Sequence, residues 1–207
     1  MALRFEPDVS HADWWAGRDE PWQQLCTIGP RGFAAYVQVL HPLDDEDDRV
    51  FTLADVEGNL DDRVFTSLTE VLAEHTGTPD DCWIAWWEGD GYTDHPGLMP
   101  REALAGPRVR LPQDHPDREY LLFRGAPADA VARDVGMPAR ADGMGLGSPA
   151  AMWPDDHAWF MALDVDSSWT GIGGSHALAD RLLGDPRFET RTVACTVDIV
   201  DPRGGPF

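Results

Sequence analysis

Three segments of this sequence share one local pattern, a Pro-Asp pair followed closely by an apolar run rich in aromatic residues. They begin at Pro79, Pro116 and Pro154. Proline fixes φ and aspartate closes a turn through its own side chain, so each pair predicts a turn. The aromatic residues that follow suit a pleated, buried surface, so each run predicts a strand. The sequences between the three copies do not match, which argues against a repeat architecture.

The clearest helix is predicted over residues 61–75, where apolar side chains recur with helical spacing. They are Val64, Phe65, Leu68, Val71 and Leu72. A shorter helix is expected to start at Pro21, and another runs from the N-cap residue Ser175 to Gly184. Loose alternation over residues 33–41 predicts a further strand.

Residues 157–166 and 188–197 are also expected to be strands, and residues 167–174 a loop between the first of them and the following helix. Strands of this chain thus come in mixed order with few helices. That favours an α+β fold, with a mixed, mostly antiparallel sheet and two or three packed helices, over a doubly wound parallel fold.

The apolar fraction of 43% is enough for a substantial core. We therefore expect residues 1–207 to form a single α+β domain. Residues 1–30 are expected to pack on it as an N-terminal segment, residues 136–150 to be a mobile loop rich in Gly and Pro, and residues 201–207 to be a loose tail.

The charge balance restricts the possible partners. The chain has 37 Asp and Glu against 16 basic residues, all of them Arg, and a net charge of -21. A GC-rich genome explains Arg in place of Lys, but not the excess of acid. Such a surface repels nucleic acid and anionic membranes, so neither is an expected partner. Binding to a basic protein partner is compatible with this charge.

The cysteines and the N-terminal residues indicate in which cellular compartment the protein is expected. Cys26, Cys82 and Cys195 are odd in number and lack C-x-x-C spacing, so we expect reduced thiols in a cytoplasmic protein. The N-terminus has no apolar core of signal-peptide length. The longest dense apolar stretch, residues 82–87, is far too short to span a membrane.

The sharpest candidate site is the glycine-rich segment before the last predicted helix. Its ligand-binding residues would be Gly171, Gly173, Gly174, Ser175 and His176. A loop of this kind entering a helix can aim backbone N–H groups at a phosphate. Asp164 and Asp166, two apart on a predicted strand, would share one face and could hold a divalent metal as cofactor. Alternatively, the glycines only permit a tight connection and Ser175 is an ordinary N-cap.

Known motifs do not settle the question. The P-loop pattern requires Lys, which the chain lacks. The acyl-CoA-binding loop of GNAT acetyltransferases is partly resembled by Gly171-Ile172-Gly173, but Ser168 stands where Gln or Arg belongs. The acidic run 44–48 has Arg49 where a calcium loop needs Gly. The seven His are dispersed, and no hydrolase or zinc motif occurs.

Nine Trp form the other notable feature. Alternation along a strand places Trp83 and Trp87 on one face and Trp86 on the other, so both faces need cover. Trp14, Trp15 and Trp22 are expected to pack the N-terminal segment onto the sheet. Some of these rings could instead anchor a partner, a role for which Trp is enriched.

Two function classes remain. Residues 153–159 (Trp-Pro-Asp-Asp-His-Ala-Trp), 173–175 (Gly-Gly-Ser) and 116–125 resemble a family of acidic proteins from GC-rich bacteria. The resemblance implies no activity and no catalytic residue. The first class is a non-catalytic binding or interaction module, immunity-like or regulatory, that meets a basic partner. The second is an enzyme or small-molecule-binding domain that holds a phosphate-bearing ligand at residues 171–175.

Overall fold

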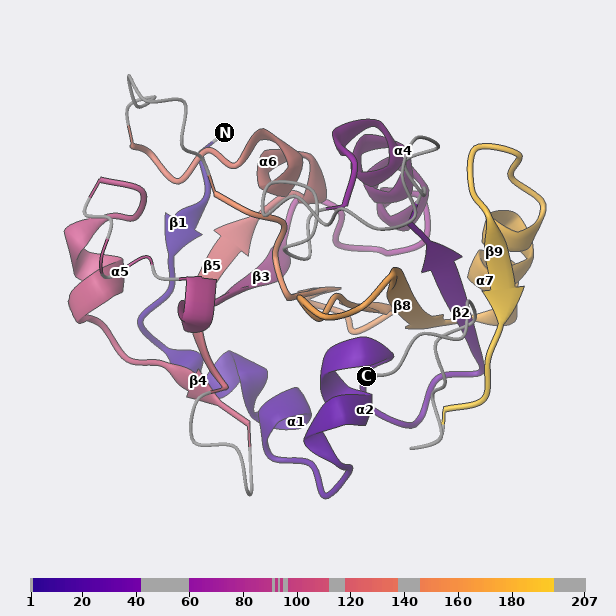
Figure 1. Ribbon diagram of the computed structural model, residues 1–207, viewed down its shortest axis with the longest axis horizontal. Coiled ribbons are helices and arrows are strands. Elements are labelled where there is room, and N and C mark those ends of the chain that lie inside the picture. The colour runs from indigo at the N-terminus through magenta and orange to yellow at the C-terminus, as the bar shows by residue number, and fades with distance from the viewer. Residues whose placement is uncertain are drawn as a thin grey trace, which may run out of the picture.

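The structure is a computed structural model that describes residues 2–41, 60–90, 92, 94, 97–111, 118–137 and 146–195. Its centre is a nine-stranded sheet in the order β1-β5-β3-β6-β7-β8-β2-β9, with β4 also paired to β5 (Figure 1). Every strand pairing is antiparallel. The predicted α+β fold is confirmed.

The strands are β1 (Arg4–Phe5), β2 (Ala35–Leu40), β3 (Cys82–Trp87), β4 (Val109–Arg110), β5 (Glu119–Gly125), β6 (Ala151–Pro154), β7 (Phe160–Ala162), β8 (Trp169–Gly174) and β9 (Thr190–Thr192). The helices are α1 (Asp13–Ala16), α2 (Trp22–Thr27), α4 (Asp62–Ala73), α5 (Arg101–Ala105), α6 (Pro127–Ala132) and α7 (His176–Leu183), with short 3-10 helices η1 (Val9–Ala12) and η2 (Glu88–Asp90). The helices thus outnumber the two or three expected, because α1, α5 and α6 are too short to show a helical repeat of apolar residues in the sequence.

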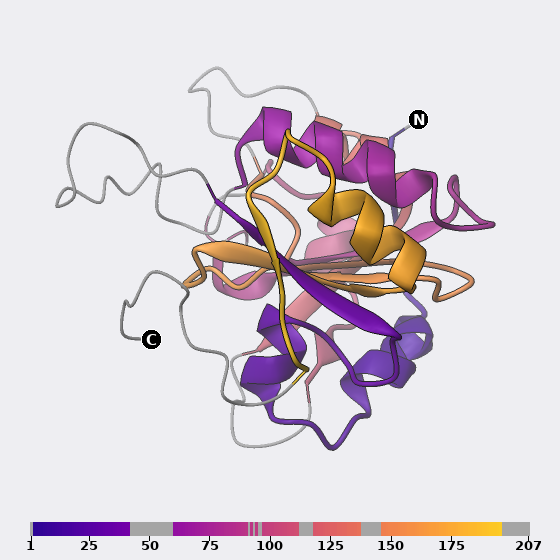
Figure 2. The same ribbon diagram turned by 90° about the vertical axis from the view of Figure 1, so that its right-hand side faces the viewer.

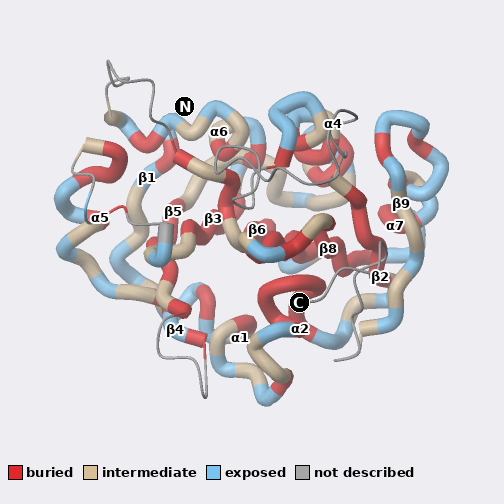
Figure 3. The backbone as a smooth tube through the Cα atoms, in the orientation of Figure 1, coloured by how far each residue is buried: buried red, intermediate tan, exposed pale blue. Residues whose placement is uncertain are grey.

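Both faces of the sheet are apolar because helices cover both. Helices α4 and α7 lie on one side and α1 and α2 on the other, as Figure 2 shows. The first face packs around Phe65 and Trp86, and the second around Trp15, Trp83 and Trp153. Buried residues accordingly follow the strands through the middle of the molecule (Figure 3). The predicted division of Trp83 and Trp86 between opposite faces is confirmed.

Most local predictions are confirmed. Helix α4 begins after Asp61, whose side chain accepts hydrogen bonds from two backbone N–H groups, and α2 and α7 start where expected. The predicted loop at 167–174 is wrong, because β8 occupies most of it. Strand β6, directly before the turn at 155–156, was not predicted. The acidic run 44–48, the tail 201–207 and much of 136–150 lie outside the described residues.

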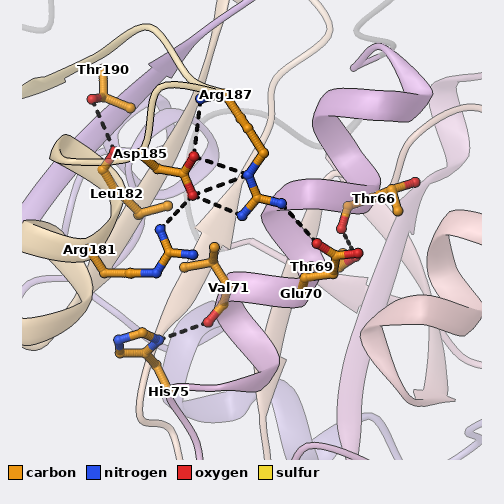
Figure 4. A network of polar contacts seen from close by, with 10 residues as sticks. All are labelled: Thr66, Thr69, Glu70, Val71, His75, Arg181, Leu182, Asp185, Arg187 and Thr190. Carbon is orange, nitrogen blue, oxygen red and sulfur yellow. Dashed lines mark hydrogen bonds and ion pairs between the residues drawn. The ribbon is translucent and has the colours of Figure 1, made fainter.

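A buried carboxylate joins two helices near the end of the sheet (Figure 4). The side chain of Asp185, 4% exposed, accepts hydrogen bonds from Arg181 at the end of α7 and from Arg187. Arg187 in turn donates to Glu70 on α4 at 2.9 Å. Hydrogen bonds from Arg187, opposed by burial and helped by Arg181, hold the pKa of Asp185 far below its usual range.

This depressed pKa predicts an acid-sensitive contribution to stability. A carboxylate whose pKa falls on folding stabilises the fold above its unfolded pKa of about 4, and the effect is lost as pH falls through the folded value. Asp185→Asn should therefore lower the free energy of unfolding by about 1–3 kcal/mol at pH 7. The difference in the free energy of unfolding between this variant and the parent protein should become smaller below pH about 4. Denaturant titrations at several pH values measure it, with the exposed Asp180→Asn as control. A gap that does not change with pH would contradict the assignment.

Candidate interaction surface

The segment predicted as a ligand-binding loop is a buried central strand. Gly171, Gly173 and Gly174 lie in β8, which pairs with β2 on one side and β7 on the other, so the ladders use its backbone N–H groups. A Cβ atom on Gly171 would collide with the carbonyl oxygen of Thr27 and lie 2.6 Å from Cα of Ile28. Glycine is needed here because α2 packs directly on the strand.

The last two residues of that predicted site flank the start of α7. Ser175 is the N-cap, as one alternative held, and its Oγ accepts a hydrogen bond from the N–H of Leu178 at 3.2 Å. His176, the first residue of the helix, is exposed. Whether the five residues bind a ligand stays a prediction, but the loop on which it relied is a strand.

The two predicted metal ligands lie beyond the end of β7, in a turn, and do not share a strand face. Asp166 is exposed, whereas Asp164 is buried and forms an ion pair with Arg118 at 2.8 Å. Burial raises the pKa of Asp164, with Arg118 opposing. The guanidinium of Arg118 is stacked between Trp22 at 4.8 Å and Trp87 at 4.7 Å. Asp164 thus already has a cationic partner from the chain itself.

Two of the three thiols, those of Cys26 and Cys82, are buried, and that of Cys195 is partly buried. Cys26 contacts the hydroxyl of Tyr120 at 3.2 Å, and burial raises the pKa of both Cys26 and Cys82 to about 12. At neutral pH both are protonated, and a thiol is a weak nucleophile. Among the residues that the structure describes, no three His, Cys, Asp or Glu side chains are grouped so as to hold a metal ion.

Four carboxylates come together where two turns meet at one end of the sheet. Asp80 and Asp81 precede β3, and Asp155 and Asp156 follow β6; they become neighbours because the two strands pair. The N–H of Asp155 donates to the carbonyl oxygen of Asp81 at 2.9 Å, which joins the two turns, and after burial the negative charges of all four contribute to the raised pKa of Cys82. Three of the four are exposed and Asp81 is partly buried. We call this group the acidic turn surface.

Hydrogen bonds within and between the turns hold the surface in place. The carboxylate of Asp156 accepts from the hydroxyl of Thr76 at 2.8 Å, the N–H of Gly77 at 2.7 Å and the N–H of Ala158 at 3.1 Å. Burial acts to raise the pKa of Asp156, but these hydrogen bonds outweigh it and lower the pKa. The carboxylate therefore stays ionised and oriented.

Aromatic rings border the acidic turn surface. The imidazole of His11 stacks on Trp83 at 4.1 Å, and Arg124 lies over the same indole at 4.6 Å. Arg124 also donates from Nε and Nη2 to the two carboxylate oxygens of Asp81, and these hydrogen bonds lower the pKa of that carboxyl group. The indole Nε1–H of Trp83 donates to Asp155 at 3.3 Å. Carboxylate and indole together thus hold a guanidinium here.

Sequence reasoning treated these Asp residues only as turn formers. The available signal was the doubled Asp after Pro at 79–81 and again at 154–156, which the third copy at 116–118 lacks. Nothing in a spacing of about 75 residues says that the two turns lie side by side. That follows from the pairing of β3 with β6, and β6 was not predicted.

The described residues contain no helix that is long and apolar enough to cross a membrane. The acidic turn surface is ordered by hydrogen bonds to Asp156 and Asp81, and three of its four carboxylates are exposed. Comparison of the chain with protein-family models, with curated proteins and with solved structures gives no match.

Proposed function

We propose that this protein is a non-catalytic interaction module, regulatory or immunity-like, which binds a basic protein partner through the acidic turn surface. One observation carries the proposal. Four carboxylates from turns far apart in the sequence meet at one end of the sheet, and hydrogen bonds orient three of them before any partner arrives. A pre-ordered surface binds with a smaller loss of conformational entropy.

The chemistry of the surface favours a guanidinium-bearing partner. Arg124 shows how a guanidinium binds here, since it stacks on Trp83 and donates two hydrogen bonds to the carboxylate of Asp81. Trp83 is buried and already contacts His11 and Arg124, so a partner's guanidinium would be held by two parallel hydrogen bonds to a carboxylate, which an ammonium group cannot form in this planar geometry. Asp80 and Asp155 lie beside this pair and are exposed to solvent.

Long-range electrostatics support the same partner. A net charge of -21 attracts a basic protein and accelerates its encounter, and the effect weakens as salt screens the charges. Overall charge alone would not select a site, however. The proposal requires that carboxylates of the acidic turn surface matter more than equally exposed carboxylates elsewhere.

A matched pair of double variants tests that requirement. Asp80→Asn/Asp155→Asn removes two charges from the surface, leaves Asp81 and Asp156 unchanged and keeps an amide oxygen that can accept from Trp83. Asp19→Asn/Asp180→Asn removes two exposed charges elsewhere. Binding of a fluorescent octa-arginine peptide at 50 mM salt should weaken about fivefold in the first variant and less than twofold in the second. Equal losses would show attraction to net charge alone and would refute the proposal.

A further inference from the structure

A groove of about 680 Å³ opens between the edge strand β1 and helix α5. Its lining is mostly apolar: Leu3, Phe5, Pro7, Pro100, Ala105, Gly106, Pro107 and Val135, with Arg4 and Glu102 as its charged members. The groove is separate from the acidic turn surface, but Arg4 borders both, since its charge helps to lower the pKa of Asp81.

The walls of the groove are fixed by packing. The ring of Phe5 lies edge-on against Phe123 at 5.8 Å. Gly106 ends α5 directly over that ring, because a Cβ atom at this position would overlap Cζ of Phe5. The guanidinium of Arg108 donates to the carbonyl oxygens of Ala103 at 2.9 Å and Gly106 at 2.7 Å, which ties down the end of the helix.

One backbone position of β1 faces this groove. Arg4 pairs with Arg124 and the N–H of Glu6 donates to the carbonyl of Leu122 at 2.9 Å, so these alternate residues point toward β5. The N–H and C=O of Phe5 therefore point away from β5. Among the described residues, the neighbouring outward N–H, that of Leu3, is taken by the carbonyl of Asp134 at 2.7 Å.

The position is thus bounded at both ends. Asp134 occupies the edge beside Leu3, and Pro7, the next outward position after Phe5, has no N–H to offer. An added chain can make one pair of ladder hydrogen bonds with Phe5 and then must leave the edge. Addition of a short extended segment to a sheet edge is a common mode of peptide recognition.

We infer that the groove binds a short extended segment of a basic partner protein, which pairs with the backbone of Phe5. Its apolar side chain lies over Phe5, and an arginine two residues away reaches Glu102 on α5, because side chains two apart share a face of a strand. The basic character of the partner rests on the proposed function, whereas the groove and the outward direction of the N–H and C=O of Phe5 do not.

Charge and shape exclude the other occupants. A second copy would bring another chain of net charge -21 against the first, and like charges of that size repel. A small ligand needs most of its surface covered, whereas this groove is open along the edge strand. An extended segment buries one side and leaves the other in water, as the groove allows.

The probe is the peptide acetyl-Thr-Val-Thr-Arg-Thr-amide, in which Val and Arg share a face. We expect a dissociation constant on the order of 100 µM, typical of a small interface. In ¹⁵N spectra the amide of Phe5 should shift and exchange more slowly with solvent. N-methylation of the peptide Val, the residue opposite Phe5, should weaken binding about tenfold, since a hydrogen bond is lost. N-methylation of the neighbouring Thr residues should weaken binding less.

Two protein variants locate the binding. Ala105→Trp fills the groove from the last, exposed residue of α5, and should abolish binding. Ala177→Trp makes the same change at an exposed residue of α7, a helix that packs against β2, β9 and α4, and should leave binding unchanged. Glu102→Arg should weaken the affinity for the Arg-containing peptide about tenfold. It should restore the affinity when the Arg of the peptide is replaced by Glu.

The outcomes separate the two proposals. Asp80→Asn/Asp155→Asn should leave peptide binding within about twofold, because the peptide contacts the groove. If that variant loses the peptide while Ala105→Trp does not, the groove proposal is wrong and the proposed function stands. No shift at Phe5 at millimolar peptide, or a concentration-dependent dimer that Ala105→Trp abolishes, also overturns the groove proposal.

Discussion

Replacing Arg118 with methionine should lower the free energy of unfolding by about 3–5 kcal/mol at pH 7, because Asp164 is left as an unpaired charge in the interior. Methionine keeps much of the apolar stem that fills the space between Trp22 and Trp87. The loss therefore reports on the ion pair more than on packing. Urea titration measures it.

The sign of its pH dependence follows from Asp164. Burial raises the pKa of this carboxyl group, and removing Arg118 removes the charge that opposes burial. A carboxyl group whose pKa is raised on folding destabilises the fold increasingly as pH rises above its unfolded value of about 4. The deficit of Arg118→Met should thus be largest at neutral pH and shrink toward pH about 4.

Two comparisons make this result specific. Arg110→Met breaks the exposed pair with Glu119, whose Arg side chain is 72% exposed, and should cost less than about 1 kcal/mol. Arg118→Met/Asp164→Leu removes both buried charges and should recover most of the stability. A deficit that persists in the double variant would show that Arg118 acts through its stacking on the indoles instead.

Gly171→Ala should destabilise the fold by about 3 kcal/mol, or prevent folding, since overpacking against backbone atoms relaxes poorly. The new Cβ would overlap the carbonyl oxygen of Thr27 and crowd Cα of Ile28, so α2 would have to move off β8. Gly184→Ala is the control. That glycine has φ -90° and its nearest obstacle is the carbonyl oxygen of Asp180 at 3.3 Å, so a change below about 1 kcal/mol is expected.

The result at Gly171 also separates packing from ligand binding. If this glycine served a mobile, ligand-binding loop, alanine would be tolerated in the free protein and would affect only ligand-dependent stabilisation. A melting temperature within about 2 °C of the parent protein would therefore contradict the account of β8 as a packed strand.

Local signals predicted much of the fold. The stripe of apolar residues in α4 and the alternation of Trp83 and Trp86 in β3 report burial directly, because each periodicity matches one element. Strand β8 was missed because glycine has low β propensity. Gly171 is there for the approach of α2, and that packing is decided by residues about 140 positions earlier in the chain.

The candidate surfaces were less accessible to prediction. Asp81 and Asp156 were expected to form turns, and they do, but their proximity depends on how β3 and β6 pair. Likewise, the groove depends on β1, a strand of two residues whose place beside β5 no local pattern indicates. The composition shows that the net charge is negative, but only the strand topology shows where the carboxylates of the acidic turn surface lie.

The order of the strands also dictates when the protein can fold on the ribosome. Strand β2 is synthesised well before both of its partners, since Val37 pairs with Ile172 on one side and Thr192 on the other. It must therefore wait, apolar and unpaired, until residues 169–192 have emerged. Contacts between residues so distant in sequence slow folding, so we expect nascent chains of this protein to depend on chaperones that shield β2 until β8 and β9 have been synthesised.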